Sequence, residues 1–251
     1  MKLYVLGCAG WIPSKNETCC FLIEHKGHLI MLDAGTGVSN IKHYQDILGK
    51  YDTLHIILTH YHLDHIIGLS YLLPYVSNKD VIIYGPGIPS YRKSTKKILS
   101  EFFQPYFFSR PLEKLAQKLE CVDYSKEPIF NIGDIIISVT KQIHSSPSFS
   151  IMLDDELLYV TDTIFDAKRW ADTHGVKVLL HECWQIHGDD SQQKHCSLES
   201  ILKNIPLGNF KKILLIHQNP TWNENDIATI SESIKDTNIS LAKDLEKIEI
   251  L

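Results

Sequence analysis

The chain of 251 residues lacks the features that mark several special classes of protein. It has no uninterrupted apolar run long enough to span a bilayer. Gly10 and Pro13 interrupt the N-terminus too early for a signal peptide, so we expect a cytoplasmic protein. There is also no linker, low-complexity tract or strict repeat, and a single domain over residues 1–251 is predicted.

Disulfide-type cysteine spacing and an excess of basic charge are also absent. The six cysteines form no C-x-x-C pair, which is typical of buried thiols and not of a disulfide framework. Cys19 and Cys20 are adjacent in a predicted strand, so their side chains should point to opposite faces and not share one metal. With 25 basic and 30 acidic residues, the formal net charge of −5 disfavours a protein that holds long nucleic acid by its backbone.

Strands are predicted in both halves of the chain, with helices between them. The predicted strands cover residues 3–6, 19–24, 28–32, 54–58, 81–84, 118–123, 134–143, 148–153, 157–161, 176–180 and 213–216, with a C-terminal strand pair; the predicted helices cover residues 38–48, 66–73, 196–204 and 224–236, with two more between residues 90 and 116. This order favours two packed sheets with helices outside, a four-layer αββα sandwich of the α/β (α+β) class.

One stretch, His60-Tyr61-His62-Leu63-Asp64-His65, offers four metal-binding side chains within a few residues. It directly follows the predicted buried strand 54–58. A rigid strand that ends in imidazoles and a carboxylate can hold metal ions in fixed geometry. The alternative is an ordinary polar loop, but this spacing favours a metal site.

Three further candidate ligands also follow predicted strands. His144 follows strand 134–143, Asp162 follows strand 157–161, and His217 follows strand 213–216. Each one alone could be a structural polar residue. Together with the histidine-rich stretch they make five histidines and two aspartates, which is the number of ligands that two metal ions need.

Several motifs carry a resemblance to a known superfamily. Thr59-His60-x-His62-x-Asp64-His65 resembles the defining motif of the metallo-β-lactamase-fold hydrolases. The segments that resemble its ribonuclease Z-like branch are Gly7-Cys8-Ala9-Gly10-Trp11-Ile12-Pro13-Ser14, His144-Ser145-Ser146-Pro147-Ser148-Phe149, His181-Glu182-Cys183, Lys194-His195-Cys196-Ser197 and His217-Gln218-Asn219-Pro220. The resemblance covers essentially the whole chain and implies a metal-dependent phosphodiesterase.

The same resemblance implies how the ligands are shared. One metal would be held by His60, His62 and His144, the other by Asp64, His65 and His217, with Asp162 bridging both. This donor set suits Zn²⁺ and also admits Mn²⁺ or Fe²⁺. Two such ions would lower the pKa of water toward ~7 and so supply a nucleophile for attack on phosphorus.

The candidate catalytic residues are His195, Glu182 and Asp64, and Asp64 is also one of the predicted ligands. His195 would give a proton to the leaving oxygen; the alternative is a histidine that caps the helix starting near Ser197. Glu182 would orient His195 or a ligand imidazole. Asp33 would support the histidine-rich loop from behind, or simply begin a helix. We expect His181 and His187 to be structural or surface residues.

The spacing of the later ligands indicates the size of the substrate. His144 and Asp162 are 18 positions apart, and two strands with their turn fill that interval. The bacterial ribonuclease Z enzymes carry their tRNA-gripping arm at this place, so the resemblance favours small or cyclic phosphodiesters such as cyclic nucleotides. The alternatives are a tRNA 3′-processing endoribonuclease, a thioester, lactone or β-lactam hydrolase, and a binding protein with a vestigial site.

The aromatic stretch 102–108 contains five rings in seven residues and is broken by Pro105. It could belong to the core, form a patch used in a homodimer, or stack a nucleobase. We expect a homodimer, because a segment broken by proline packs poorly as regular core.

Overall fold

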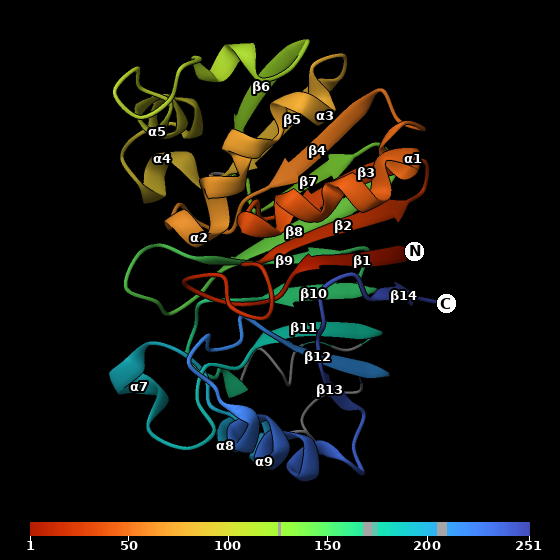
Figure 1. Ribbon diagram of the computed structural model, residues 1–251, viewed down its shortest axis with the longest axis vertical. Helices are drawn as coiled ribbons and strands as arrows, with labels where there is room; N and C mark the ends of the chain where they lie inside the picture. The colour runs from red at the N-terminus through yellow and green to blue at the C-terminus, as the bar shows by residue number, and fades with distance from the viewer. Residues whose placement is uncertain (125–126, 168–172, 174, 205–209) are drawn as a thin grey trace.

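The computed structural model describes residues 1–124, 127–167, 173, 175–204 and 210–251. Two mixed seven-stranded sheets pack face to face, and helices cover the outer face of each sheet (Figure 1). The predicted αββα sandwich is therefore confirmed. The two chain ends lie side by side, because the strand near the C-terminus pairs with the first strand.

The first sheet has the order β14-β1-β2-β3-β4-β5-β6. Its strands are β1 (Lys2–Gly7), β2 (Cys20–His25), β3 (His28–Leu32), β4 (Thr53–Ile57), β5 (Asp80–Gly85), β6 (Lys118–Asp123) and β14 (Lys247–Glu249). Strands β3 to β6 run parallel to one another, whereas β1 is antiparallel to both β2 and β14. The β2–β3 hairpin turns at Lys26 and Gly27, both with positive φ, as the sequence predicts.

The second sheet has the order β13-β12-β11-β10-β9-β8-β7. Its strands are β7 (Ile129–Ile132), β8 (Ile135–Lys141), β9 (Phe149–Leu153), β10 (Leu157–Val160), β11 (Val178–Glu182), β12 (Lys212–Ile216) and β13 (Ile239–Leu241). Strands β10 to β13 are parallel, and β7 to β10 are joined antiparallel. Both sheets thus present the C-terminal ends of parallel strands, where ligands bind in such sheets.

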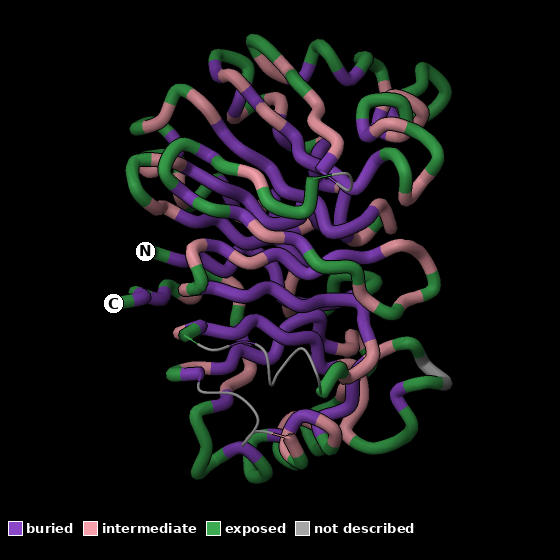
Figure 2. The backbone as a smooth tube through the Cα atoms, turned by 180° about the vertical axis from the view of Figure 1, so that it is seen from behind, coloured by how far each residue is buried: buried purple, intermediate pink, exposed green. Residues whose placement is uncertain are grey.

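Three apolar cores separate the four layers. The largest core lies between the sheets, and each of the other two lies between one sheet and its helices. Figure 2 shows the buried backbone concentrated in the central strands and the exposed backbone in the outer turns. Cys19 belongs to the core between the sheets and Cys20 to the core under the helices, so the predicted opposite facing of their side chains is confirmed. All six cysteines are free.

The helices depart most from the predictions. Those in the described part of the chain are η1 (Thr36–Tyr44), α1 (Gln45–Leu48), α2 (Leu63–Ile66), η2 (Ile67–Tyr71), α3 (Leu73–Val76), α4 (Gly87–Ser90), α5 (Thr95–Phe102), η3 (Leu112–Lys114), α7 (Asp190–Gln193), α8 (Leu198–Asn204) and α9 (Glu224–Ile234). The predicted helix 38–48 is mostly a 3₁₀ helix, and the predicted helix 66–73 is broken into short turns. Gly68 explains the second break, because its N–H bonds to Ala34 O and a Cβ there would lie 2.0 Å from Gly35 O.

Two strand predictions were wrong or incomplete. The C-terminal strands do not pair with each other, because β13 joins the second sheet and β14 the first. Strand β7 was missed, since Pro128 and Gly133 bound a segment of only four residues. Among the described residues, no helix combines the length and the hydropathy needed to cross a membrane.

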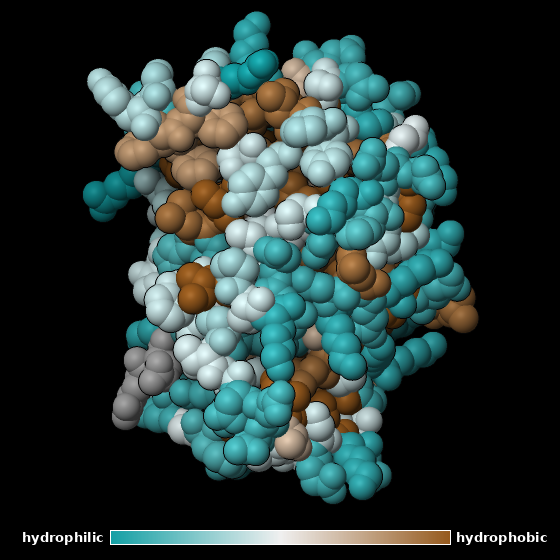
Figure 3. Space-filling model, viewed as in Figure 1, coloured by the Kyte–Doolittle hydropathy of each residue, from teal (hydrophilic) through white to brown (hydrophobic). Residues whose placement is uncertain are grey.

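The aromatic stretch 102–108 divides between core and surface. Phe103 is buried under the first sheet, with Phe102 and Phe108 packed beside it. Tyr106 and Phe107 are 92% and 79% exposed. Figure 3 shows apolar side chains gathered over this part of the molecule, near α4 and α5. The segment therefore supplies both core packing and an exposed aromatic patch, which is Tyr106 with Phe107.

A half-buried carboxylate, Asp244, anchors the loop that follows β1. It accepts hydrogen bonds from Glu17 N at 2.7 Å and from the Cys8 thiol at 3.4 Å. Burial raises the pKa of Asp244 to about 6. A carboxyl whose pKa is raised by folding binds its proton more tightly in the folded state, so the free energy of unfolding should fall as the pH rises from about 4 to 7.

We expect Asp244→Asn to remove this part of the pH dependence, because the amide oxygen still accepts from Glu17 N and no charge forms. The measurement is urea unfolding of the wild type and the variant at pH 4.5, 6 and 7.5. The free energy of unfolding of the variant, relative to that of the wild type, should increase as the pH rises. A constant difference would contradict the raised pKa.

Candidate metal centre

The predicted ligands meet at one edge of the two sheets. Strand β4 is followed by the loop 59–65, β10 by Asp162 and β12 by His217. His144 follows β8, which runs in the same direction as β10 because both are antiparallel to β9. The C-terminal ends of strands from both sheets thus bring together side chains from four distant parts of the chain.

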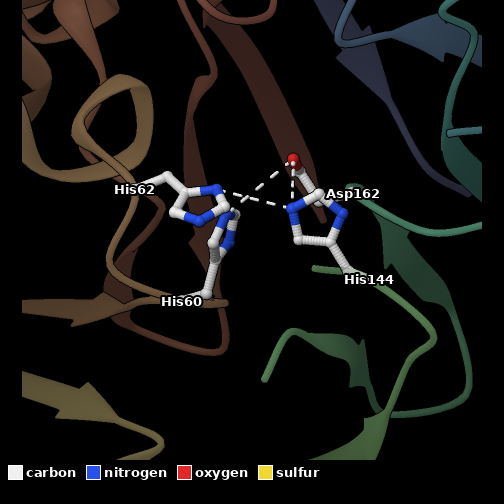
Figure 4. A group of neighbouring side chains, drawn as sticks. All are labelled: His60, His62, His144 and Asp162. Carbon is white, nitrogen blue, oxygen red and sulfur yellow. Dashed lines mark hydrogen bonds and ion pairs between the residues drawn. The ribbon is translucent and has the colours of Figure 1, made fainter. Parts of the chain in front are cut away.

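Four of these side chains form the first cluster. Figure 4 shows His60, His62, His144 and Asp162 converging on one point from separate segments. His144 Nε2 lies 3.4 Å from His62 Nδ1 and 3.5 Å from Asp162 Oδ1. His60 Nε2 lies 3.8 Å from the same carboxylate oxygen. One nitrogen or oxygen of each residue lies within 4.8 Å of the others, which is compact enough to surround a metal ion.

Asp64, His65 and His217 form a second cluster beside the first. Asp64 Oδ2 lies 3.3 Å from His217 Nε2 and 3.4 Å from His65 Nε2. Asp162 connects the two clusters, because its Oδ2 lies 3.0 Å from His65 Nε2 and 3.3 Å from His217 Nε2. One oxygen of Asp162 therefore faces each cluster, which is the arrangement that a bridging carboxylate requires.

The chemistry of the two clusters fits metal ions. The Nε2 atom of His60 is buried and has no hydrogen-bond partner in the described part of the chain, and Asp162 Oδ1 lies 3.8 Å from it. A buried imidazole nitrogen without a partner loses its hydration without compensation. A divalent cation would satisfy this nitrogen, and the clustered donors, imidazoles with carboxylates, are those that Zn²⁺, Mn²⁺ and Fe²⁺ accept.

The carboxylates and imidazoles of the two clusters lie close enough to shift one another's pKa values. Burial acts to raise the pKa of Asp162, but the surrounding imidazoles, His217 first, lower it well below its usual range. Burial acts to lower the pKa of His65, but the carboxylates of Asp64 and Asp162 raise it well above its usual range. His60 has no carboxylate as close, and burial lowers its pKa. The carboxylates are thus held ionised, as metal ligands must be.

Three residues at the strand ends have left-handed backbone conformations. The φ angles of Asp33, Asp162 and His217 are 51°, 51° and 48°. Few non-glycine residues adopt this region, at a cost of about 1–3 kcal/mol each, and Asp and His adopt it more readily than most. The strain at Asp162 and His217 falls on predicted ligands, which indicates that the fold accepts a local cost to aim these side chains at the clusters.

Asp33 lies behind the histidine-rich loop, as predicted. It accepts hydrogen bonds from Thr59 N at 2.7 Å and from Thr59 Oγ1 at 2.8 Å, and His65 Nδ1 lies 2.7 Å from its Oδ2. Tyr159 Oη also donates to Asp33 at 2.8 Å, from the other sheet. No sequence signal points to Tyr159, because its contact depends on how the sheets face each other. Because Asp33 binds Nδ1 of His65, Nε2 of this imidazole is the nitrogen that can bind a metal.

His195 and Glu182 also lie together, beside the second cluster. Glu182 Oε2 lies 2.7 Å from His195 Nδ1 and 3.6 Å from His217 Nδ1, so Glu182 contacts both a candidate acid and a predicted ligand. Burial acts to raise the pKa of Glu182, but the His195 and His217 imidazoles lower it below its usual range. The indole of Trp184 stacks on His195 with ring centroids 5.0 Å apart.

The other histidines differ from His195 in their surroundings. Helix capping is not the role of His195, because Ser197 Oγ is the atom that accepts from Ser200 N at the start of α8. His181 is buried with Nδ1 2.8 Å from Glu182 O, and the exposed His187 pairs with Glu199. Both are placed as structural or surface residues, as expected. His174, for which no role was predicted, lies outside the described residues.

A cavity of about 190 Å³ opens over the clusters. Its lining residues are Trp11, His62, Asp64, His144, Ser145, Asp162, Trp184, His195 and His217. Sequence reasoning did not assign Trp11, Ser145 or Trp184 to the site. A larger cavity of about 420 Å³ is lined by Lys26, Asp154 and other residues near the β2–β3 and β9–β10 turns. That cavity contains no histidine, so the donor clusters and not cavity size identify the site.

Gly10 packs directly against a predicted ligand. A Cβ at this position would lie 2.4 Å from Cε1 and 2.5 Å from Nδ1 of His217. We therefore expect Gly10→Ala to displace this imidazole and weaken metal binding about 10- to 100-fold, the size seen when support of a ligand is lost. The measurement is competition with a chelator of known affinity.

Gly27→Ala is the matched control for Gly10→Ala. Gly27 has φ +77° in an open turn, and a Cβ at this position would meet no atom within 4 Å. Its substitution should lower the free energy of unfolding by about 1–3 kcal/mol through strain and leave metal affinity unchanged. Equal metal affinity in the Gly10 variant and the wild type would show that His217 is not a ligand.

With the geometry established, comparison with known proteins identifies the family. The family model described as anti-Pycsar protein Apyc1 matches residues 1–237. The chain belongs to the Apyc1 family. Ribonuclease Z of Clostridioides difficile (strain 630) is 26% identical over 275 aligned positions, which cover 88% of this chain and 89% of that enzyme.

Solved structures show the same fold. The metallo-β-lactamase fold protein YhfI from Bacillus subtilis superposes with a TM-score of 0.76 at 17% identity, covering 99% of each chain. A diphosphatase from the PhnP family superposes with a TM-score of 0.70 at 16% identity, covering 99% of this chain and 97% of the other. This Apyc1-family chain therefore has the metallo-β-lactamase fold, and its predicted resemblance to that superfamily is confirmed. It is a metal-dependent hydrolase of the phosphodiesterase class, as predicted.

Proposed function

We propose that this chain hydrolyses small cyclic phosphodiesters, and cyclic nucleotides in particular. The observation that carries the proposal is the segment between His144 and Asp162, all of which the structure describes. It consists of the short loop 145–148, β9, the turn at residues 154–156 and β10, and β9 and β10 are paired. No arm emerges beside the cavity at this point, and the small cavity suits a compact substrate. The Apyc1 family, whose members degrade cyclic nucleotides, supports the same substrate class.

The roles of the clustered residues are part of this proposal. His60, His62 and His144 would hold one metal ion, Asp64, His65 and His217 a second, and Asp162 would bridge them. Zn²⁺ is the preferred ion, with Mn²⁺ or Fe²⁺ as alternatives. Two divalent ions would activate water and neutralise charge on the phosphoryl oxygens.

The residues beside the clusters would protonate the leaving group or fix the orientation of the imidazole rings. Glu182 holds Nδ1 of His195, so Nε2 is the nitrogen left to give a proton to the leaving alkoxide. Ser146 Oγ lies 3.1 Å from His62 Nε2 and keeps Nδ1 of this imidazole toward the first cluster. Trp184 covers one face of His195 and restricts its ring to one orientation.

The test is a substrate panel with the metal-loaded protein. It contains 3′,5′-cyclic nucleotides of all four bases, bis-p-nitrophenyl phosphate and a precursor tRNA, with metal content measured in parallel. Turnover of cyclic nucleotides without tRNA cleavage is the expected result. Clean cleavage at the tRNA 3′ end without cyclic nucleotide turnover would overturn the proposal.

A tRNA 3′-processing nuclease is the second candidate. The alignment with ribonuclease Z along most of both chains favours it. The formal net charge of −5 and the short β9–β10 segment argue against it, because tRNA binding relies on many phosphate contacts. The thioester, lactone and β-lactam alternatives are no longer needed, since the family and its relatives act on phosphodiesters.

We also propose a homodimer in the cytoplasm, formed through the exposed pair Tyr106 and Phe107. Exposed aromatic pairs of this kind are typical of interfaces. The double substitution Tyr106→Ser with Phe107→Ser should convert a dimer into a monomer, measured by light scattering after size-exclusion chromatography. A wild-type monomer, or a variant that stays dimeric, would contradict this interface.

A further inference from the structure

Trp11 is an unusual residue at the mouth of the site. Its side chain is 62% exposed, although burying an indole is normally favourable. Its backbone has φ 60°, a left-handed conformation that bulky residues avoid. Exposure and backbone strain both oppose placing tryptophan here on grounds of stability alone, which points to a role in binding.

The backbone of Trp11 explains where the indole is held. Its N–H donates to Asp64 Oδ2 at 2.8 Å, and the N–H of the preceding Gly10 donates to Gln218 O at 2.9 Å. Gly10 also packs against the His217 ring. The loop is thus fixed to both sides of the second cluster, and the indole of Trp11 lines the cavity above it.

The cavity is too small to enclose a whole cyclic nucleotide. Pockets that enclose whole drug-sized ligands are roughly 300–1,000 Å³, and this cavity is about 190 Å³. The phosphodiester must reach the donor clusters, so the phosphate and sugar fill the cavity. A base attached to that sugar must then lie at the rim, where Trp11 offers a flat apolar ring.

The other indole that lines the cavity, that of Trp184, already packs against two histidines. Trp184 stacks on His195 and contacts His217, with ring centroids 5.0 and 5.5 Å apart. No ring contact of Trp11 with another described aromatic residue is observed, and the exposure of its side chain leaves a face for a ligand. Trp11 is therefore the better platform for a base.

We propose that the indole of Trp11 stacks on the nucleobase of the substrate and selects base-bearing cyclic phosphodiesters over base-free ones. This inference rests on the proposed function. Stacking does not depend on base identity, because every base has a π-face. The preference should therefore extend to all four bases, and the chemistry at phosphorus should not depend on Trp11.

The experiment compares two substrates in four proteins. The substrates are a 3′,5′-cyclic ribonucleotide and its base-free analogue, the 3,5-cyclic phosphate of 1-deoxyribofuranose, which keeps the 2-hydroxyl. The proteins are the metal-loaded wild type, Trp11→Ala, Trp11→Phe and Ile12→Ala. Ile12 is the matched control, because it is the exposed apolar neighbour of Trp11 but does not line the cavity. All four retain the backbone N–H that binds Asp64, and metal content is measured in each.

The expected result is a change in substrate preference. Trp11→Ala should lower kcat/KM for the cyclic nucleotide roughly 5- to 150-fold, mainly through KM, the range that loss of base stacking produces. It should leave kcat/KM for the base-free analogue unchanged. Trp11→Phe should restore most of the loss, and Ile12→Ala should behave as the wild type.

Two other outcomes are informative in different ways. Equal losses on both substrates, or no loss on either, would overturn the stacking role of Trp11 and leave the proposed function intact. A wild type that hydrolyses no cyclic nucleotide at full metal occupancy would overturn the proposed function and this inference with it.

Discussion

Asp162→Asn is expected to remove metal binding and nearly all activity without unfolding the chain. Asp162 contacts both clusters, with Oδ1 toward His144 and Oδ2 toward His65 and His217. Asparagine keeps the shape of the side chain and tolerates the left-handed backbone at this position, so the substitution removes mainly the charge. Metal affinity should fall more than about 100-fold, since even supporting residues contribute 10- to 100-fold.

The loss of activity should follow the loss of metal. An ion that activates water and stabilises the transition state contributes several kcal/mol, so kcat/KM should fall about 10³-fold or more. Elemental analysis after dialysis measures the metal, and far-UV circular dichroism verifies the fold. Asp134→Asn is the control, because this exposed aspartate in the β7–β8 turn should change neither property. A variant with two ions per chain and wild-type activity would refute the bridging role.

The sequence was sufficient to predict that the candidate ligands lie close together, because they occur at or soon after the ends of apolar strands. His60, Asp162 and His217 all lie one to three residues beyond buried strands whose C-terminal ends share one edge. Alternating apolar residues and continuous apolar runs predict such strands well. Polar residues that directly follow parallel strands are then expected to lie at the same edge of the sheet. Glu182 could be paired with His195 only through the family motifs, and the structure shows the two in contact.

Residues whose role depends on the packing of distant elements were not predictable. Tyr159 reaches Asp33 only because the two sheets face each other, and Gly10 matters only because the ring of His217 lies against it. The left-handed backbone of Trp11 also has no local signal, since tryptophan is a poor residue for that conformation. Helix 66–73 failed for the same reason, because Gly68 contacts a turn more than 30 residues earlier in the chain.

His195→Ala is expected to retain both metal ions and to lower kcat on cyclic nucleotides about 10²- to 10⁴-fold, the contribution of a positioned general acid. Its Nδ1 is taken by Glu182, and its ring stacks on Trp184 at the wall of the cavity. Yet His195 also lies close enough to Asp162 and His217 to complete a metal site. Metal content therefore decides between an acid, which leaves it unchanged, and a ligand, which lowers it.

Comparing substrates with different leaving groups gives a sharper test of His195 as the general acid. A p-nitrophenolate leaves without a proton, whereas the alkoxide of a cyclic nucleotide needs one. The loss in His195→Ala should therefore shrink toward a few-fold on bis-p-nitrophenyl phosphate, while a displaced metal would impair both substrates alike. Glu182→Gln should show the same substrate dependence with a smaller loss of about 10- to 100-fold, because glutamine still reaches Nδ1 but no longer stabilises the charged imidazole. Equal losses on both substrates would assign His195 to metal binding and leave the leaving oxygen without a proton donor.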